Sequence, residues 1–111
     1  MDKLFEELNI IIEELKDGDD YHKPINVHSI DRCYKFIEWM PNLNENIEVT
    51  LQPTGYLSLS FRNGLDNAEI VFEKDYLIWI RNQNQKITSG KIYQSKYVFF
   101  HVLSEVLKIF D

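Results

Sequence analysis

The sequence predicts an α+β fold: one domain over residues 1–111, in which an antiparallel sheet of four to five strands packs against two N-terminal helices and one C-terminal helix. Apolar residues recur at helical spacing near both ends of the chain, whereas between positions 46 and 93 they alternate with polar residues and are interrupted by turn sequences. A length of 111 residues with 44% hydrophobic residues is enough for one core.

The first helix is expected to begin at Asp2, which can cap it, and to run to about Lys16. Its apolar side is formed by Leu4, Phe5, Leu8, Ile11, Ile12 and Leu15. At 100° per residue four glutamates fall on the opposite side, namely Glu6, Glu7, Glu13 and Glu14. An aspartate-rich turn then ends the helix with Asp17, Gly18, Asp19 and Asp20.

After a connecting loop over residues 21–28, the second helix is expected over residues 30–40, with Ser29 as its cap and Pro41 as its stop. Its inner face would be formed by Ile30, Cys33, Tyr34, Phe36, Ile37 and Met40. Trp39 falls outside this apolar arc.

Five strands are expected, over residues 46–51, 57–62, 68–73, 76–81 and, more weakly, 86–93. Between the second and third, the extra residues after Asn63 and Gly64 predict a loop longer than a two-residue hairpin turn. A polar loop is expected over residues 82–85. The fourth strand is apolar on both faces, which predicts that both of its faces are covered.

The last helix is expected over residues 95–110, and its apolar side chains span roughly 200° of its circumference, more than one core requires. Two explanations are open. The helix packs between the sheet and another helix, or it forms the surface of a homodimer or a partner complex.

The net charge of −6 belongs entirely to the first 20 residues, which hold eight acids and two bases and leave ten of each for the remainder. Direct nucleic-acid binding is disfavoured, since no cluster of Lys and Arg could follow a phosphate backbone. No segment is expected to span a membrane and no signal peptide is recognised, so a cytoplasmic protein is expected. The acidic end is either a solvated helix face or a docking surface for a basic protein.

No arrangement of residues predicts catalysis, a metal or a cofactor, so a non-enzyme is expected. The single cysteine, Cys33, is expected to be buried and inert. His22 and His28 near two aspartates match no metal-ligand spacing. His101 lies beside Glu105 and Lys108 on the last helix, where a surface ion pair explains it at least as well as acid–base catalysis does.

The aromatic residues suggest contacts with another protein, because Tyr, Trp and Arg commonly anchor protein interfaces. Trp39, Trp79 and Tyr56, which lies beside Ser58, Ser60 and Arg62 in the sequence, are the candidates. The alternative is that the three aromatic side chains belong to the core or its edge.

The order of motifs resembles that of a loosely defined group of small uncharacterised bacterial and phage proteins. It consists of a helix ending in Pro, a strand, a Pro-x-Gly-x-Leu-x-Leu-x-aromatic hairpin, a lone Gly and a closing helix. The matching residues are Pro41, Pro53, Gly55, Leu57, Leu59, Phe61, Gly90 and the tail 103–110. The resemblance implies a place in mobile elements or beside toxin genes, and an inhibiting or neutralising role.

The function expected from the sequence is a stoichiometric inhibitor, such as an immunity, antitoxin-like or anti-defence protein, that covers a basic, nucleic-acid-handling protein partner. The alternative is a dimeric, acidic, secretion-type chaperone that associates through its C-terminal helix. The partner-binding residues expected are Glu6, Glu7, Glu13, Glu14, Asp17, Asp19, Asp20, Trp39, Tyr56 and Arg62.

Overall fold

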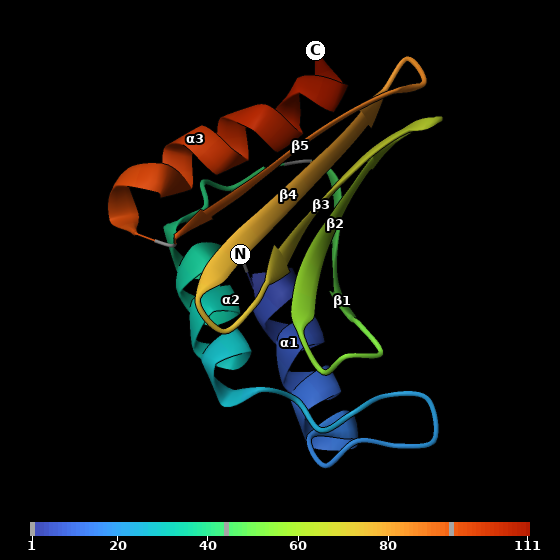
Figure 1. The fold of residues 1–111 in the computed structure, drawn as a ribbon, viewed down its shortest axis with the longest axis vertical. Coiled ribbons are helices and arrows are strands. Elements are labelled where there is room, and N and C mark those ends of the chain that lie inside the picture. Colours follow the sequence, from blue (N-terminus) through green and yellow to red (C-terminus); the bar gives the residue numbers. More distant parts are fainter. Residues whose placement is uncertain (1, 44, 94) are drawn as a thin grey trace.

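Five strands form one antiparallel sheet in chain order, and three helices pack against it (Figure 1). The computed structural model describes residues 2–43, 45–93 and 95–111, with the backbone alone for residues 2, 96 and 97. The elements are α1 (Asp2–Leu15), α2 (Val27–Trp39), β1 (Asn46–Leu51), β2 (Leu57–Asn63), β3 (Asp66–Phe72), β4 (Tyr76–Gln83), β5 (Lys86–Tyr93), α3 (Lys96–Leu107) and a final 3₁₀ turn, η1 (Lys108–Phe110). The predicted α+β class and the order of its elements are confirmed.

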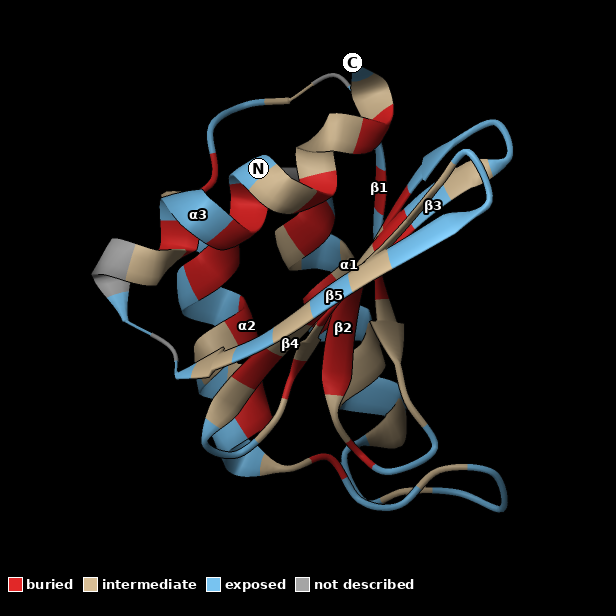
Figure 2. Cartoon of the chain, turned by 45° about the horizontal axis from the view of Figure 1, so that its top comes forward, coloured by how far each residue is buried: buried red, intermediate tan, exposed pale blue. Residues whose placement is uncertain are grey.

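The described helices cover the same face of the sheet, and the core lies between the two layers (Figure 2). The strand register aligns Val49, Leu59, Ile70 and Trp79 in one row across this inner face, and each is buried. From the helices, Phe36 packs edge-on against Phe72 of β3 at 5.5 Å and against Phe99 of α3 at 4.6 Å between ring centroids. Aromatic contacts of this geometry add to the stabilisation from burial.

The second helix begins at Val27 instead of residue 30, because Asn26 caps it instead of Ser29. The Asn26 side-chain oxygen accepts hydrogen bonds from the backbone N–H groups of His28 and Ser29. Ser29 is fully buried and its hydroxyl accepts the backbone N–H of Leu57 at 2.8 Å, so the side chain joins α2 to β2. Asn and Ser both commonly cap helices. Here Asn26 is the cap, because the Ser29 hydroxyl bonds the sheet instead.

The prediction that Tyr34 belongs to the inner face of α2 is wrong. Its side chain is 49% exposed, and its ring lies 4.9 Å from that of Phe5 on α1. The remaining predicted positions pack on the core, and Cys33 is buried as expected.

Two connections are tighter than predicted. Asn63 pairs directly with Asp66, which leaves Gly64 and Leu65 as a two-residue turn, and Gly64 has the positive φ of +62° that such turns require. Likewise β4 continues to Gln83, and only Asn84 and Gln85 form the turn to β5, with φ of 54° and 64°. A two-residue turn with both φ values positive matches the twist of the strands it joins.

The prediction that β4 is covered on both faces is also wrong. Leu77 and Trp79 are buried on the inner face, whereas Ile78 on the opposite face is only half-buried and Ile80 is 39% exposed. The apolar side chains of α3 pack mainly inside the chain, since Phe99, Val102, Leu103 and Val106 belong to the core, together with Ile109 of η1. Phe100 stays 67% exposed.

Candidate functional site

The open face of the sheet, defined here as the side opposite the three helices, carries two kinds of side chain. Over β1 and β2 it is polar, whereas over β4 and β5 it is largely aliphatic and aromatic. The polar positions are Glu48, Thr50, Ser58, Ser60 and Arg62, and the positions over β4 and β5 include Tyr76, Ile78, Ile80, Ile87 and Tyr93. β3 lies between the two halves and places Glu69 beside Ser60 on one side and Ile80 on the other.

Glu69 is the most constrained acid of the open face. Gln52, which directly follows β1, donates its amide N–H to the Glu69 carboxylate and also to the Ser58 hydroxyl, the latter at 3.2 Å. The Ser58 hydroxyl in turn contacts Thr50. Partial burial of the carboxyl raises the pKa of Glu69, and a hydrogen bond with Ser58 opposes this shift. The ionised form of such a carboxyl group is stabilised by a positive charge close to it.

A shallow hollow of about 340 Å³ lies beside Glu69, lined by Ser60, Phe61, Arg62, Gly64, Asn67, Ala68 and Glu69. Arg62 is exposed, and no ion pair is formed between it and Glu69 in the described part of the chain. The hollow therefore offers a guanidinium, a carboxylate and neutral polar groups to a partner side chain.

The other half of the open face ends in a pair of tyrosines. The rings of Tyr76 and Tyr93 lie 4.6 Å apart and their hydroxyls 3.2 Å apart, while the Lys91 ammonium lies 4.2 Å from the centre of the Tyr76 ring. Tyr93 is 67% exposed and Ile87 71% exposed. Exposed aromatic and aliphatic side chains gathered over two strands are typical of interaction surfaces.

The three aromatic residues that the sequence suggested as anchors of a protein interface lie in three different parts of the structure. Tyr56 directly precedes β2 and, by alternation with buried Leu57, lies half-buried on the open side, whereas Arg62 is close to the opposite end of β2. Trp79 belongs to the core and its indole lies against Gly90. Trp39 is half-buried between two helices, with its ring edge-on to Phe99 at 5.6 Å.

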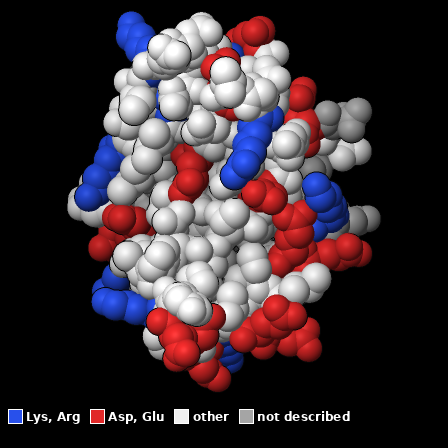
Figure 3. Space-filling model, turned by 90° about the vertical axis from the view of Figure 1, so that its right-hand side faces the viewer, with Lys and Arg blue, Asp and Glu red and all other residues white. Residues whose placement is uncertain are grey.

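Most of the predicted acidic residues lie exposed on α1 and on the turn that follows it, and acidic side chains gather in the lower and right-hand parts of the side drawn in Figure 3. The exposed acids are Glu6, Glu13, Glu14, Asp17, Asp19 and Asp20. Glu7 differs, because its carboxylate accepts the backbone N–H of Val49 at 3.0 Å and so joins α1 to the edge of β1. Glu7 therefore has a structural contact that its helical position alone did not predict.

Asp19 also has a structural role. Its carboxylate accepts the backbone N–H groups of Tyr21 and His22, at 2.8 and 2.7 Å, and contacts the His22 ring at 2.9 Å. These hydrogen bonds, first that from Tyr21 and then that with the His22 ring, lower the pKa of Asp19. The carboxylate thus organises the turn after α1.

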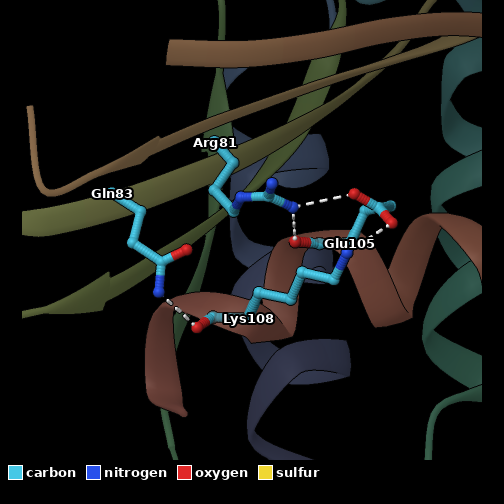
Figure 4. A network of polar contacts seen from close by, with 4 residues as sticks. All are labelled: Arg81, Gln83, Glu105 and Lys108. Carbon is cyan, nitrogen blue, oxygen red and sulfur yellow. Dashed lines mark hydrogen bonds and ion pairs between the residues drawn. The ribbon is translucent and has the colours of Figure 1, made fainter. Parts of the chain in front are cut away.

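A polar network joins α3 and η1 to the inner side of the sheet (Figure 4). It consists of Arg81, Gln83, Glu105 and Lys108. Arg81 donates to both the backbone carbonyl and the carboxylate of Glu105 at 2.8 Å, and Lys108 reaches the same carboxylate at 2.9 Å. Gln83 donates to the Lys108 carbonyl at 2.7 Å. The sequence placed His101, Glu105 and Lys108 together as an ion pair. Glu105 and Lys108 do form one, but His101 has no ion pair among the described residues, and the two strand residues were not predicted.

In the described residues, no three His, Cys, Asp or Glu side chains are close enough together to hold a metal ion. Burial raises the pKa of the Cys33 thiol. No described helix is both long and apolar enough to cross a bilayer. Comparison with protein-family models, with curated proteins and with solved structures gives no match to this chain.

Proposed function

We propose that the protein is a non-catalytic binding module that contacts a protein partner through the open face of its sheet, with the exposed acids of α1 as a second contact. The observation that carries the proposal is that this face has no helix over it in the described chain, yet presents Ile80, Ile87 and Tyr93 to solvent. Exposed apolar side chains beside polar groups on one surface are typical of a protein interaction surface.

The charge distribution favours a partner with a basic surface. Glu6, Glu13 and Glu14 are exposed, and none of the three has an ion-pair partner among the described side chains. A basic surface that normally holds nucleic acid is attracted to such an array. We therefore propose a stoichiometric inhibitor of immunity, antitoxin-like or anti-defence type, which occupies the nucleic-acid site of its partner.

The decisive experiment compares two triple charge reversals in affinity purification followed by titration of the recovered partner. Glu6, Glu13 and Glu14 are changed to Lys in the first variant; the control reverses three exposed acids away from the open face, Asp31, Glu38 and Asp111. We expect the first variant to lose the partner and the control to keep it. Adding the wild-type protein should abolish nucleic-acid binding by the partner at a molar ratio of one to one.

A second variant tests the open face itself. Ile80→Asp places a charge among its apolar side chains, while the control Phe100→Asp changes a side chain that is 67% exposed on α3, on the helical side of the sheet. Loss of binding with Ile80→Asp alone supports the proposal. Equal binding of the partner by the two triple charge-reversal variants contradicts the proposal. So does a partner that still binds nucleic acid when it is saturated with this protein.

A further inference from the structure

The two edges of the sheet are protected to different degrees. The edge at β1 lies beside α1, and Glu7 occupies one of its outward N–H groups, that of Val49. The edge at β5 has eight residues in continuous register with β4, without a proline, and no further strand pairs with it in the described chain. Long, regular, unprotected edge strands readily pair with another strand.

The backbone groups available on β5 follow from its turn. Gln83 and Lys86 flank a two-residue turn and so form a hydrogen-bonded pair, and the pattern then alternates along the strands. The N–H and C=O groups that point away from β4 therefore belong to Ile87, Ser89, Lys91 and Tyr93. Their side chains lie on the open face, where Ile87 and Tyr93 are among the most exposed apolar residues of the chain.

We infer that β5 pairs antiparallel with β5 of a second copy about a two-fold axis at Gly90, which joins two sheets into one of ten strands. In this register Ile87 of one copy lies opposite Tyr93 of the other, and Ser89 lies opposite Lys91. Each pair occurs twice, and each brings together residues whose backbone groups point outward.

Neighbouring registers are less favourable. An axis at Lys91 places two ammonium groups opposite each other, and an axis at Ser89 places Ile87 opposite Lys91. Like charges opposite one another destabilise an antiparallel pair, whereas aromatic and β-branched residues opposite one another stabilise it. The strand is thus self-complementary about Gly90, which favours a second copy over an unrelated extended segment.

A mixture of two cysteine variants tests this register. Opposite residues have Cα atoms about 5.5 Å apart, within the range of a disulfide. We expect Ile87→Cys and Tyr93→Cys proteins to form a mixed disulfide under mild oxidation. Neither should cross-link with itself, since equivalent residues would lie six positions apart along the strand, roughly 20 Å. The native Cys33 is buried, so we expect it to form no disulfide that would compete with the mixed one.

Two substitutions at Ser89 test the pairing without a cross-link, by sedimentation over a range of concentrations. Ser89→Lys brings two further positive charges opposite Lys91, and Ser89→Glu brings two negative charges there. We expect the dimer dissociation constant to rise with Lys and fall with Glu, each by roughly 2- to 30-fold at low salt. Leu65→Lys, in the exposed turn between β2 and β3, which is not part of the paired edge, should leave it unchanged.

A wild-type protein that stays monomeric at millimolar concentration overturns the inference, as do self-cross-linking of the Ile87→Cys protein and equal shifts with Lys and Glu. These outcomes are separate from the failure of partner binding, because the reversed acids of the first helix lie away from β5. A monomer that still captures its basic partner would retain the proposed function and reject the dimer.

Discussion

The inner and open faces of the sheet are built on the same strands but differ in burial and in chemistry. Along β2 and β3, buried Leu59 and Ile70 alternate with Ser60 and Glu69, so neighbouring residues differ in burial, partners and chemistry. Each fully buried aliphatic or aromatic side chain stabilises the fold by about 1.5–3 kcal/mol, whereas a solvated polar one contributes little. Stability therefore resides in the inner layer, which leaves the open face tolerant of substitution.

Adjacent residues of β3 give the largest contrast. Phe72 is fully buried against Phe36, so Phe72→Ala should lower the free energy of unfolding by about 3–5 kcal/mol. Val71 faces the other way and is half-buried, so Val71→Ala should cost about 1 kcal/mol or less. Urea unfolding followed by tryptophan fluorescence measures both. Similar losses would mean that the open face is packed as tightly as the inner one.

On β5 too, a substitution on the inner face should cost more stability than one on the open face, but the difference should be smaller. A Cβ added to Gly90 would meet the Trp79 indole nitrogen at 2.4 Å, so Gly90→Ala should cost about 1–3 kcal/mol through overpacking. Ser89→Ala on the open face should change the stability of the monomer by less than about 0.5 kcal/mol. Thermal unfolding at low protein concentration separates the two. If Gly90→Ala is neutral, the indole moves freely and the inner layer is looser at its rim.

The alternation that separates the two faces was predictable from the sequence, because a period of two needs only neighbouring residues. The tight turns were not. Asn84 and Gln85 both adopt positive φ, and glutamine gives little local signal for that conformation. The covering of β4 was predicted wrongly because an apolar strand face looks the same whether a helix or solvent lies against it.

The contacts of the candidate site depend on long-range placement. Gln52 reaches Glu69 only because the register of three strands brings them together, and Glu7 reaches Val49 only because α1 lies beside β1. The exposure of Glu6 and Glu13 followed from the helical period alone. Local sequence therefore predicts which acids are free and fails for those that are bound to the backbone or to another strand.

The contributions of two glutamates, one on each side of the sheet, to folding stability should change with pH in opposite directions. Lys108 and then Arg81 lower the pKa of Glu105 from its ordinary value of 4.5. Its ionised form therefore stabilises the folded state above the unfolded pKa, and this contribution is lost as the pH falls through the lower folded pKa. Glu105→Gln should cost about 0.5–1 kcal/mol at pH 7, since solvent reaches these ion pairs, and little at pH 2. A constant cost across pH would assign the effect to packing.

Glu69 gives the smallest effect and the opposite sign. Burial raises its pKa above 4.5, so the folded state holds the proton more tightly than the unfolded chain does. The stability from this residue is fully present below the unfolded pKa and is lost as the pH rises through the folded one. Glu69→Gln keeps an oxygen acceptor for Gln52 and should raise the free energy of unfolding at pH 7 by less than about 0.5 kcal/mol, with no gain at pH 3. Melting curves of wild type and variant at both pH values measure this. A variant less stable than wild type at pH 7 would mean that the carboxylate is already satisfied within the chain, which would remove the reason to expect a cationic partner at the open face.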